Sequence, residues 1–190
     1  MIKKLIMKPK NKKGVMGIIL FFLILFTILI LGFIAAVSIG IIDFASDTIT
    51  PIMTDLGVVG DSNVSETAEY TFGTVDTMVT ALPWLIAFAY VAMLIFSIVF
   101  VISWNYNPNP VFMGVYFMFV ILLIFGAIIM SNMYEDIRTG TDIVAVGLQN
   151  QAALSFMILH SPLILGLMAM IVGIYIFAGK QMETQGGFDV

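Results

Sequence analysis

Long apolar segments alternate with short polar ones along this chain of 190 residues. Four apolar segments are long enough to cross a bilayer, since a helix needs about 20 apolar residues to span roughly 30 Å of hydrocarbon. They contain no Asp, Glu, Lys or Arg, and they comprise residues 15–42, 82–103, 111–130 and 154–178. A helix as long and as apolar as the first segment would have no polar face in a soluble all-α core. The pattern therefore predicts an all-α, polytopic membrane protein with four transmembrane helices.

The composition supports this class and excludes others. Hydrophobic residues make up 61% of the chain and charged residues 11%, with a mean hydropathy of +1.08. Soluble domains carry roughly 45–50% apolar and about 25% charged residues, so a soluble globular enzyme, a disordered tail and a nucleic-acid-binding domain are excluded. The charges also form clusters: six lysines in residues 1–14, seven acids between Asp43 and Asp76, and a third group at residues 135–142.

The lysines predict the orientation of the chain. Basic residues beside a span stay on the cytoplasmic side, and residues 1–14 form a basic tail directly before the first span. Its six lysines are Lys3, Lys4, Lys8, Lys10, Lys12 and Lys13. The segments assigned to the outer side, residues 43–81 and 131–153, hold one basic residue, Arg138. Four crossings return the short tail 179–190 to the inner side, so the predicted topology is N-in, C-in.

A lysine-rich start before an apolar segment is also typical of a secretory signal peptide. The apolar part of such a peptide usually has 7–15 residues, and residues 15–42 are longer, so we expect this segment to remain as the first span. At about 1.5 Å per residue it would reach about 42 Å, and we expect it to tilt or to project beyond the membrane.

The first outer segment, residues 43–81, is too long for a simple turn and is expected to carry structure. Thr50 and Pro51, followed by Gly57, predict a short helix. Thr50 is its expected N-cap, Pro51 its first helical residue and Gly57 the residue beyond its end.

A second helix is predicted from Asn63 onward, because Glu66 follows it at the spacing of a capping box. An apolar stripe continues at helical spacing through Ala68, Phe72, Val75, Val79 and Leu82. This helix either lies on the membrane surface or prolongs the second span. We favour the extension, with Pro83 as a candidate kink. The triplet that begins at Asn63 also fits an N-glycosylation acceptor, but we prefer the capping role.

The third connection is expected to be helical as well. Residues 131–137 prolong the third span, Gly140 ends it, and Thr141 or Asp142 caps a helix that runs through Gln149 into the fourth span. The outer side then carries an acidic, helical cap. Such a cap either meets another protein or is a solvated acidic face.

Four aromatic residues are candidate anchors at the two membrane interfaces. Trp84 and Trp104 lie twenty residues apart, about 30 Å along a helix, which matches the spacing of two aromatic belts. Tyr106 and Tyr134 fall at similar depths. Packing inside the protein is an equally ordinary role for any one of them.

The chain has few side chains that could bind a metal or cofactor. It has no Cys and one His, so we expect no disulfide, no metal centre and no cofactor. Glu135, Asp136 and Asp142 are read as a solvated surface in preference to a cation site, because their spacing matches no known loop. The N-terminal lysines are expected at the anionic leaflet. Binding of a polyanion is the secondary interpretation, and no specific nucleic-acid site is expected.

His160 is the one ionisable group expected inside the bilayer. It precedes Ser161 and Pro162, and the proline removes a backbone donor, which frees the carbonyl of Ile158. We interpret His160 as a neutral, kink-associated residue bonded to the first or third span or to the interface. A gating or ligand role is the alternative.

Small residues predict where the helices approach closely. Gly32, Ala36 and Gly40 repeat every fourth residue on one face of the first span, and Ala169 and Gly173 do so in the fourth. Such faces permit tight packing where lipid offers no hydrophobic drive for association.

Together these features favour a non-enzymatic structural subunit that packs with other membrane or coat proteins, in a multisubunit complex or a lipid-containing virion. One alternative is a small homo-oligomeric channel, transporter or membrane-permeabilising protein, lined by Thr27, Ser38, Ser97, His160 and Ser161. Another is an accessory subunit of a membrane enzyme. The layout is similar to those of claudins and tetraspanins in topology alone, because both families carry cysteine signatures in an outer loop and this chain has no cysteine.

Overall fold

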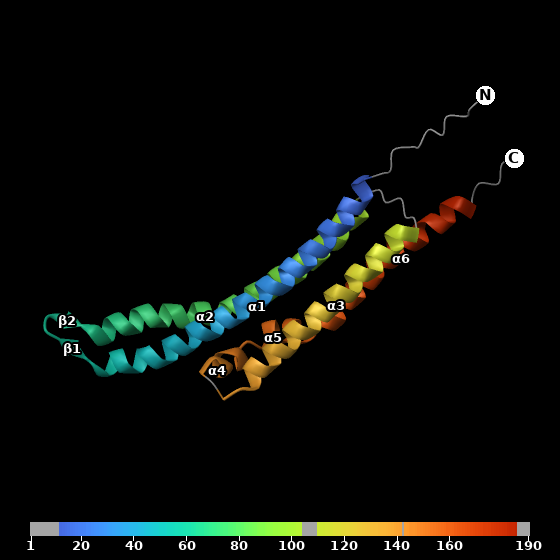
Figure 1. The fold of residues 1–190 in the computed structure, drawn as a ribbon. Coiled ribbons are helices and arrows are strands. Elements are labelled where there is room, and N and C mark those ends of the chain that lie inside the picture. Colours follow the sequence, from blue (N-terminus) through green and yellow to red (C-terminus); the bar gives the residue numbers. More distant parts are fainter. Residues whose placement is uncertain (1–11, 104–109, 142, 186–190) are drawn as a thin grey trace, which may run out of the picture.

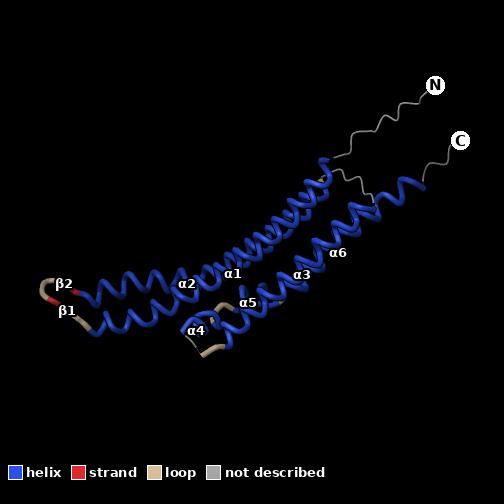
Figure 2. Tube along the Cα trace, viewed as in Figure 1, coloured by secondary structure: helices blue, strands red, loops and turns tan. Residues whose placement is uncertain are grey.

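The computed structural model describes residues 12–103, 110–141 and 143–185, and 91% of these residues are helical. The elements, in chain order, are helix α1 (Lys12–Asp55), strands β1 (Val58–Val59) and β2 (Ser62–Asn63), and helices α2 (Val64–Ile102), α3 (Pro110–Thr139), α4 (Ile143–Gln149), α5 (Ala152–Leu159) and α6 (Ser161–Gln185). Figure 2 shows how fully helices dominate the trace.

The long helices form two hairpins, α1 with α2 and α3 with α6 (Figure 1). The start of α1 and the end of α6 lie at one end of the molecule, which we name the terminal end. The β1–β2 turn and α4 lie toward the other end, and we name this the acidic end after the carboxylates of residues 43–81 and 131–153.

Three helices are long and apolar enough to cross a membrane: Met16–Asp55, Val64–Ile102 and Phe112–Thr139. A fourth crossing is reached if α5 and α6 form one span, broken at His160 and bent by 59°. The expectation of an almost entirely helical chain with several helices long and apolar enough to span a membrane is thus confirmed.

The short helix expected at Thr50 does not form separately, because α1 continues through Pro51 to Asp55. A proline inside a helix removes one backbone hydrogen bond. Pro51 and Asp47, whose carbonyl loses its helical donor, are both exposed. The hydroxyl groups of Thr50 and Thr54 donate to the carbonyls of Ser46 and Thr50, each at 2.6 Å, and reinforce the same turns.

The capping arrangement at the start of α2 is confirmed. The Asn63 side-chain oxygen accepts a hydrogen bond from the Glu66 backbone N–H at 3.2 Å, and its amide donates to the Glu66 carboxylate at 3.1 Å. From there α2 runs without interruption through Pro83 to Ile102, so the predicted extension of the second span is also confirmed.

A tight two-stranded turn joins α1 to α2. Val58 pairs with Asn63 and Val59 with Ser62. Gly57 and Gly60 have φ angles of 61° and 65°, a left-handed conformation that glycine adopts without steric cost.

The third connection differs from expectation in one respect. Helix α3 continues to Thr139 as predicted, and α4 ends at Gln149. The chain then turns at residues 150–151 before α5. The prediction that one helix runs through Gln149 into the fourth span is therefore wrong. The Gln151 side chain stabilises the turn, because its amide nitrogen donates to the carbonyl of Ala36 in α1 at 3.1 Å and to that of Gly147 at the end of α4 at 3.3 Å.

Two hydrophobic clusters hold the bundle together. The larger lies toward the terminal end and joins α1, α2, α3 and α6 around Phe22, Leu94, Leu123 and Leu165. The smaller lies toward the acidic end and joins α1 to α5, including Ala36, Tyr134 and Leu154. The described core therefore extends along the bundle and ends short of the β1–β2 turn.

Candidate interaction site at the acidic end

The small-residue face of α1 packs against α2 and α4. A Cβ built on Gly32 would lie 3.5 Å from the Tyr90 ring of α2. Ala36 is completely buried. A Cβ on Gly40 would lie 3.2 Å from the Leu148 side chain of α4.

Gly147, which the sequence analysis did not single out, makes the closest of these contacts. A Cβ on this residue would lie 2.5 Å from the carbonyl oxygen of Gly40. Helices α1 and α4 therefore cross with backbone against backbone. A single glycine in a short apolar segment does not reveal from the sequence which helix it will pack against.

The small residues of α6 accommodate a tyrosine of α3. The Tyr116 hydroxyl donates a hydrogen bond to the carbonyl of Ala169, and a Cβ on Gly173 would lie 3.2 Å from the Tyr116 ring. Tyr116 is 2% exposed. The Ala169 and Gly173 pair thus gives α3 and α6 a close, hydrogen-bonded contact, as small residues do in membrane helix pairs.

Gln151 ties the turn between α4 and α5 to α1. It is 2% exposed, and its amide nitrogen donates to the carbonyl of Ala36 at 3.1 Å. Its side-chain oxygen is buried and has no hydrogen-bond partner among the described residues. Sequence reasoning missed Gln151, although it is one of few uncharged polar residues beside the predicted fourth span.

Asp43, the first residue beyond the predicted first span, faces the same turn. It is 8% exposed, and its carboxylate accepts a hydrogen bond from the Asn150 amide at 3.3 Å. Burial raises the pKa of this carboxyl above its usual value. The Asn150 bond opposes that rise, and the charges of Asp47 and Asp76 add to it.

Tyr134 lies in the core, which corrects the expectation that it anchors the membrane interface. Its exposure is 0%, and its hydroxyl shares a 2.7 Å hydrogen bond with Ser155 of α5. Ser155 also donates to the carbonyl of Leu148 at 3.2 Å. These bonds connect α3, α4 and α5 at one point.

The chain bends by 59° at His160, between α5 and α6. His160 is exposed, and its Nδ1 lies 2.9 Å from the carbonyl oxygen of Phe156 in its own segment. The hydrogen bond expected from His160 to the first or third span is therefore not the one observed. Ser131 of α3 bonds across the break instead, donating to the Leu159 carbonyl at 2.8 Å. Ser161 is completely buried and Pro162 is half-buried.

The other residues predicted from the sequence lie at separate places or outside the described residues. Trp84 is 69% exposed on α2, and Lys12 and Lys13 are the first residues of α1. The other predicted anchors, lysines and cap lie outside the described residues, and these are Trp104, Tyr106, Lys3, Lys4, Lys8, Lys10 and Asp142.

Glu135 and Asp136 are both exposed at the end of α3. In the described part of the chain, no group of three or more His, Cys, Asp or Glu side chains is placed to hold a metal ion.

The α1–α2 hairpin continues beyond the rest of the bundle (Figure 1). We name its residues 44–76 the distal hairpin. Within it only Ser46 and Ala68 are buried. Its two helices therefore share almost no core of their own.

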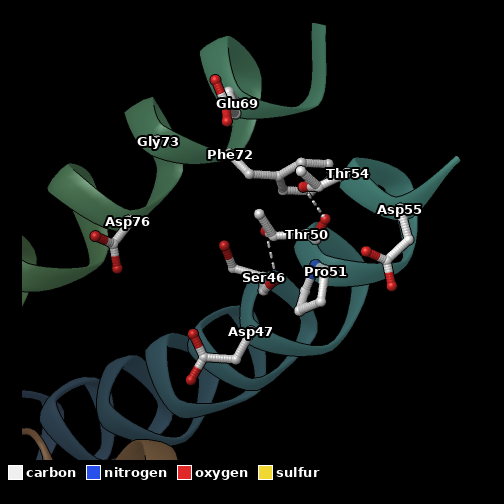
Figure 3. A pocket seen from close by; sticks show the side chains of 10 residues that line it. All are labelled: Ser46, Asp47, Thr50, Pro51, Thr54, Asp55, Glu69, Phe72, Gly73 and Asp76. Atoms are coloured by element: carbon white, nitrogen blue, oxygen red, sulfur yellow. Dashed lines mark hydrogen bonds between the residues drawn. The ribbon is translucent and has the colours of Figure 1, made fainter. Parts of the chain in front are cut away.

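An open groove of about 620 Å³ lies between the two helices of the distal hairpin (Figure 3). The ring of Phe72, from α2, lies across it toward Thr54 of α1. A Cβ on Gly73 would meet nothing within 4 Å. The groove is lined by Ser46, Asp47, Thr50, Pro51, Thr54, Asp55, Glu69, Phe72, Gly73 and Asp76.

The distal hairpin carries both acidic side chains and exposed apolar side chains. Residues 47–76 contain six carboxylates and no basic residue. Around the β1–β2 turn, the side chains of Ile52, Leu56, Val58 and Val59 are 59%, 55%, 69% and 56% exposed. We name these four residues the apolar tip.

Comparison of the chain with protein-family models, with curated proteins and with solved structures finds no match.

Proposed function

We propose that this chain is a non-enzymatic structural subunit of a larger membrane-embedded assembly, either a multisubunit complex or a lipid-containing virion. The observation that carries the proposal is the distal hairpin, which extends past the bundle with two buried residues and exposed apolar side chains at its tip. Such a feature is poorly stabilised within one chain and well suited to contact another.

The energetic argument starts from how helices are stabilised. Most helical stability in proteins comes from tertiary packing of one face. Helix α1 packs on several helices near Ala36, but beyond Ser46 it has mainly the start of α2 beside it. Contact with a neighbouring protein would supply the burial that the distal hairpin lacks.

We further propose four membrane crossings with both termini on the cytoplasmic or particle-interior side. Helices α3 and α6 lie side by side along most of their length. Because α3 is long and apolar enough to cross, a partner packed along it is expected to cross the same hydrocarbon layer. The bent pair of α5 and α6 then forms the fourth span.

The length of the first hairpin supports a projection beyond the membrane. The apolar helix Met16–Asp55 has 40 residues, about 60 Å at about 1.5 Å per residue, and the hydrocarbon core is roughly 30 Å thick. With the apolar residues 15–42 in the bilayer, the carboxylates that begin at Asp43 lie outside it.

A channel is the second candidate, and the polar side chains of the spans favour it less. The Thr27 hydroxyl donates to the carbonyl of Leu23, and the buried Ser97 hydroxyl donates to that of Leu94. His160 likewise lies within hydrogen-bond distance of a carbonyl of its own segment. These groups bond to carbonyls of their own segments, which makes them poorly placed to line a pore together.

The subunit proposal is tested by purifying the chain from its native membrane in a mild detergent. We expect native-gel electrophoresis and mass spectrometry to show a complex with defined partner polypeptides. Migration as a lone monomer with no co-purifying partner would overturn the proposal. Liposomes that hold the purified chain are expected to show no ion flux, and flux abolished by His160→Ala would favour the channel instead.

The topology is tested by cysteine labelling, for which the chain is suited because it has no native cysteine. An impermeant maleimide added to intact cells or sealed vesicles is expected to label Asp61→Cys and not Met182→Cys. The reverse pattern, or labelling of both positions, would contradict the proposed orientation.

A further inference from the structure

The apolar tip exposes four apolar side chains at the projecting end of the distal hairpin. Val58 and Val59 form β1, yet both side chains are more than half exposed. Ile52, on the last turn of α1, and Leu56, the first residue after this helix, are exposed to a similar degree. Apolar side chains gathered on a projecting element mark a surface that contacts a partner.

Acidic residues lie close to this tip on both long helices and in the turn between the strands. Asp55 ends α1, Asp61 lies in the turn between β1 and β2, and Glu66 and Glu69 lie in the first turns of α2. No Lys, Arg or His occurs in residues 43–81. The border of the tip is therefore uniformly negative.

The negative charge of this border favours one kind of surface as the partner of the tip. An opposing bilayer with anionic lipids would be repelled, since membrane attraction of this kind requires Lys and Arg near the surface. A second copy of the hairpin would bring like charges together, which is costly at an interface. A positively charged protein surface suits both the apolar centre and the acidic border.

We propose that the apolar tip docks into a partner protein whose binding site is an apolar recess bordered by lysine or arginine side chains. This inference rests on the proposed function, because it names the chemistry of one neighbour in the assembly. The acidic groove behind the tip continues the same negative surface along the hairpin (Figure 3), so basic side chains of the partner can follow it.

The test begins with paired substitutions in the full chain, produced in its native membrane. Val58→Ser with Val59→Ser makes the tip polar without touching the buried core. The matched control is Val146→Ser, which changes a valine of α4 with 57% exposure, also at the acidic end. We expect the tip variant to lower recovery of the native-gel complex at least tenfold and the control to leave it unchanged. Equal recovery of both variants would overturn the docking surface.

The identity of the occupant is tested by a photo-crosslinking amino acid at position 58, irradiated in native membranes. We expect an adduct with a different polypeptide, attached within an apolar stretch flanked by Lys or Arg, and weakened by Asp55→Asn with Asp61→Asn or by high salt. An adduct with a second copy of this chain, an adduct with lipid, or no adduct would each overturn the proposal.

The two proposals fail in distinguishable ways. If the wild-type chain migrates as a lone monomer, the structural-subunit function fails. If the complex persists with the polar tip, and position 58 yields no adduct, the function stands and the assembly holds this chain through another surface.

Discussion

Gly40 of α1 and Gly147 of α4 meet backbone to backbone, so that a Cβ on Gly147 would lie 2.8 Å from the Cα of Gly40. No side-chain rotation relieves such a contact, because the backbone of residue 147 fixes the position of its Cβ and the atom that the Cβ would meet belongs to the main chain of Gly40. The position of α4 against α1 therefore depends on the absence of a side chain at residue 147.

Gly147→Ala is predicted to destabilise the protein by about 1–3 kcal/mol, the usual cost of forcing atoms into a packed interior. Denaturation in mixed micelles of mild detergent and dodecyl sulfate measures this change. The matched control is Gly73→Ala on α2, where a Cβ meets nothing within 4 Å. Alanine favours helix over glycine by up to about 1 kcal/mol, so this control should be neutral or stabilising. Equal losses in both variants would contradict the contact.

Asp43→Asn is predicted to stabilise the folded chain at neutral pH and to have no such effect in acid. Burial raises the pKa of Asp43 in the folded state. The folded state then binds the proton more tightly than the unfolded state does, so stability falls as pH rises through the folded pKa. Asparagine carries no charge to desolvate and retains an acceptor for the Asn150 amide. Melting temperatures of both proteins at pH 7 and near pH 4 test this, and a gain that persists unchanged in acid would refute the assignment.

Tyr134→Phe is predicted to cost about 1 kcal/mol, the typical contribution of one intramolecular hydrogen bond. The change removes the bond to Ser155 and keeps the buried ring. The control is Tyr175→Phe, whose hydroxyl makes a long contact of 3.4 Å with the carbonyl of Ile102 and whose side chain is 47% exposed. The control should cost less in the same unfolding assay, and the opposite order would count against Tyr134 as a core residue.

Asn63→Ala is predicted to loosen the first turn of α2 by about 1 kcal/mol, because it removes both capping hydrogen bonds with Glu66. Hydrogen exchange of the amides of residues 64–67 should quicken roughly fivefold. Asn132→Ala, on the exposed side of α3, should leave those amides unchanged. Exchange that stays at the wild-type rate in Asn63→Ala would show that the cap does not hold the turn.

Local patterns predicted the long helices and the Asn63 cap correctly, because both depend on residues close together in the sequence. The apolar stripe follows helical spacing and is buried or half-buried from Ala68 to Val79 as expected, whereas its last predicted residue, Leu82, is 36% exposed. Such features are decided by periodicity and by short-range hydrogen bonds, so a single sequence contains them.

The errors have other causes. At Thr50 and Pro51 the sequence is compatible with a helix start or a helix interior, and α1 continues there with the hydroxyl groups of Thr50 and Thr54 bonded to the preceding turn. The turn before α5 depends on a bond from Gln151 to the carbonyl of Ala36, 115 residues away. Tyr134 was assigned to the membrane interface by its depth, whereas the neighbouring α5 determines that it is buried. For Gln151 and Tyr134, a partner distant in sequence overrides the local preference.

The unbroken course of α1 has a mechanical consequence. One continuous rod leads from the apolar residues beside Phe22 to Asp55 at the base of the β1–β2 turn, and α2 braces it along the way. The 13 residues beyond Ile42 correspond to about 20 Å of helix at about 1.5 Å per residue. On the topology and docking proposed above, the hairpin would act as a lever arm that fixes the distance between the lipid surface and a partner held at its end.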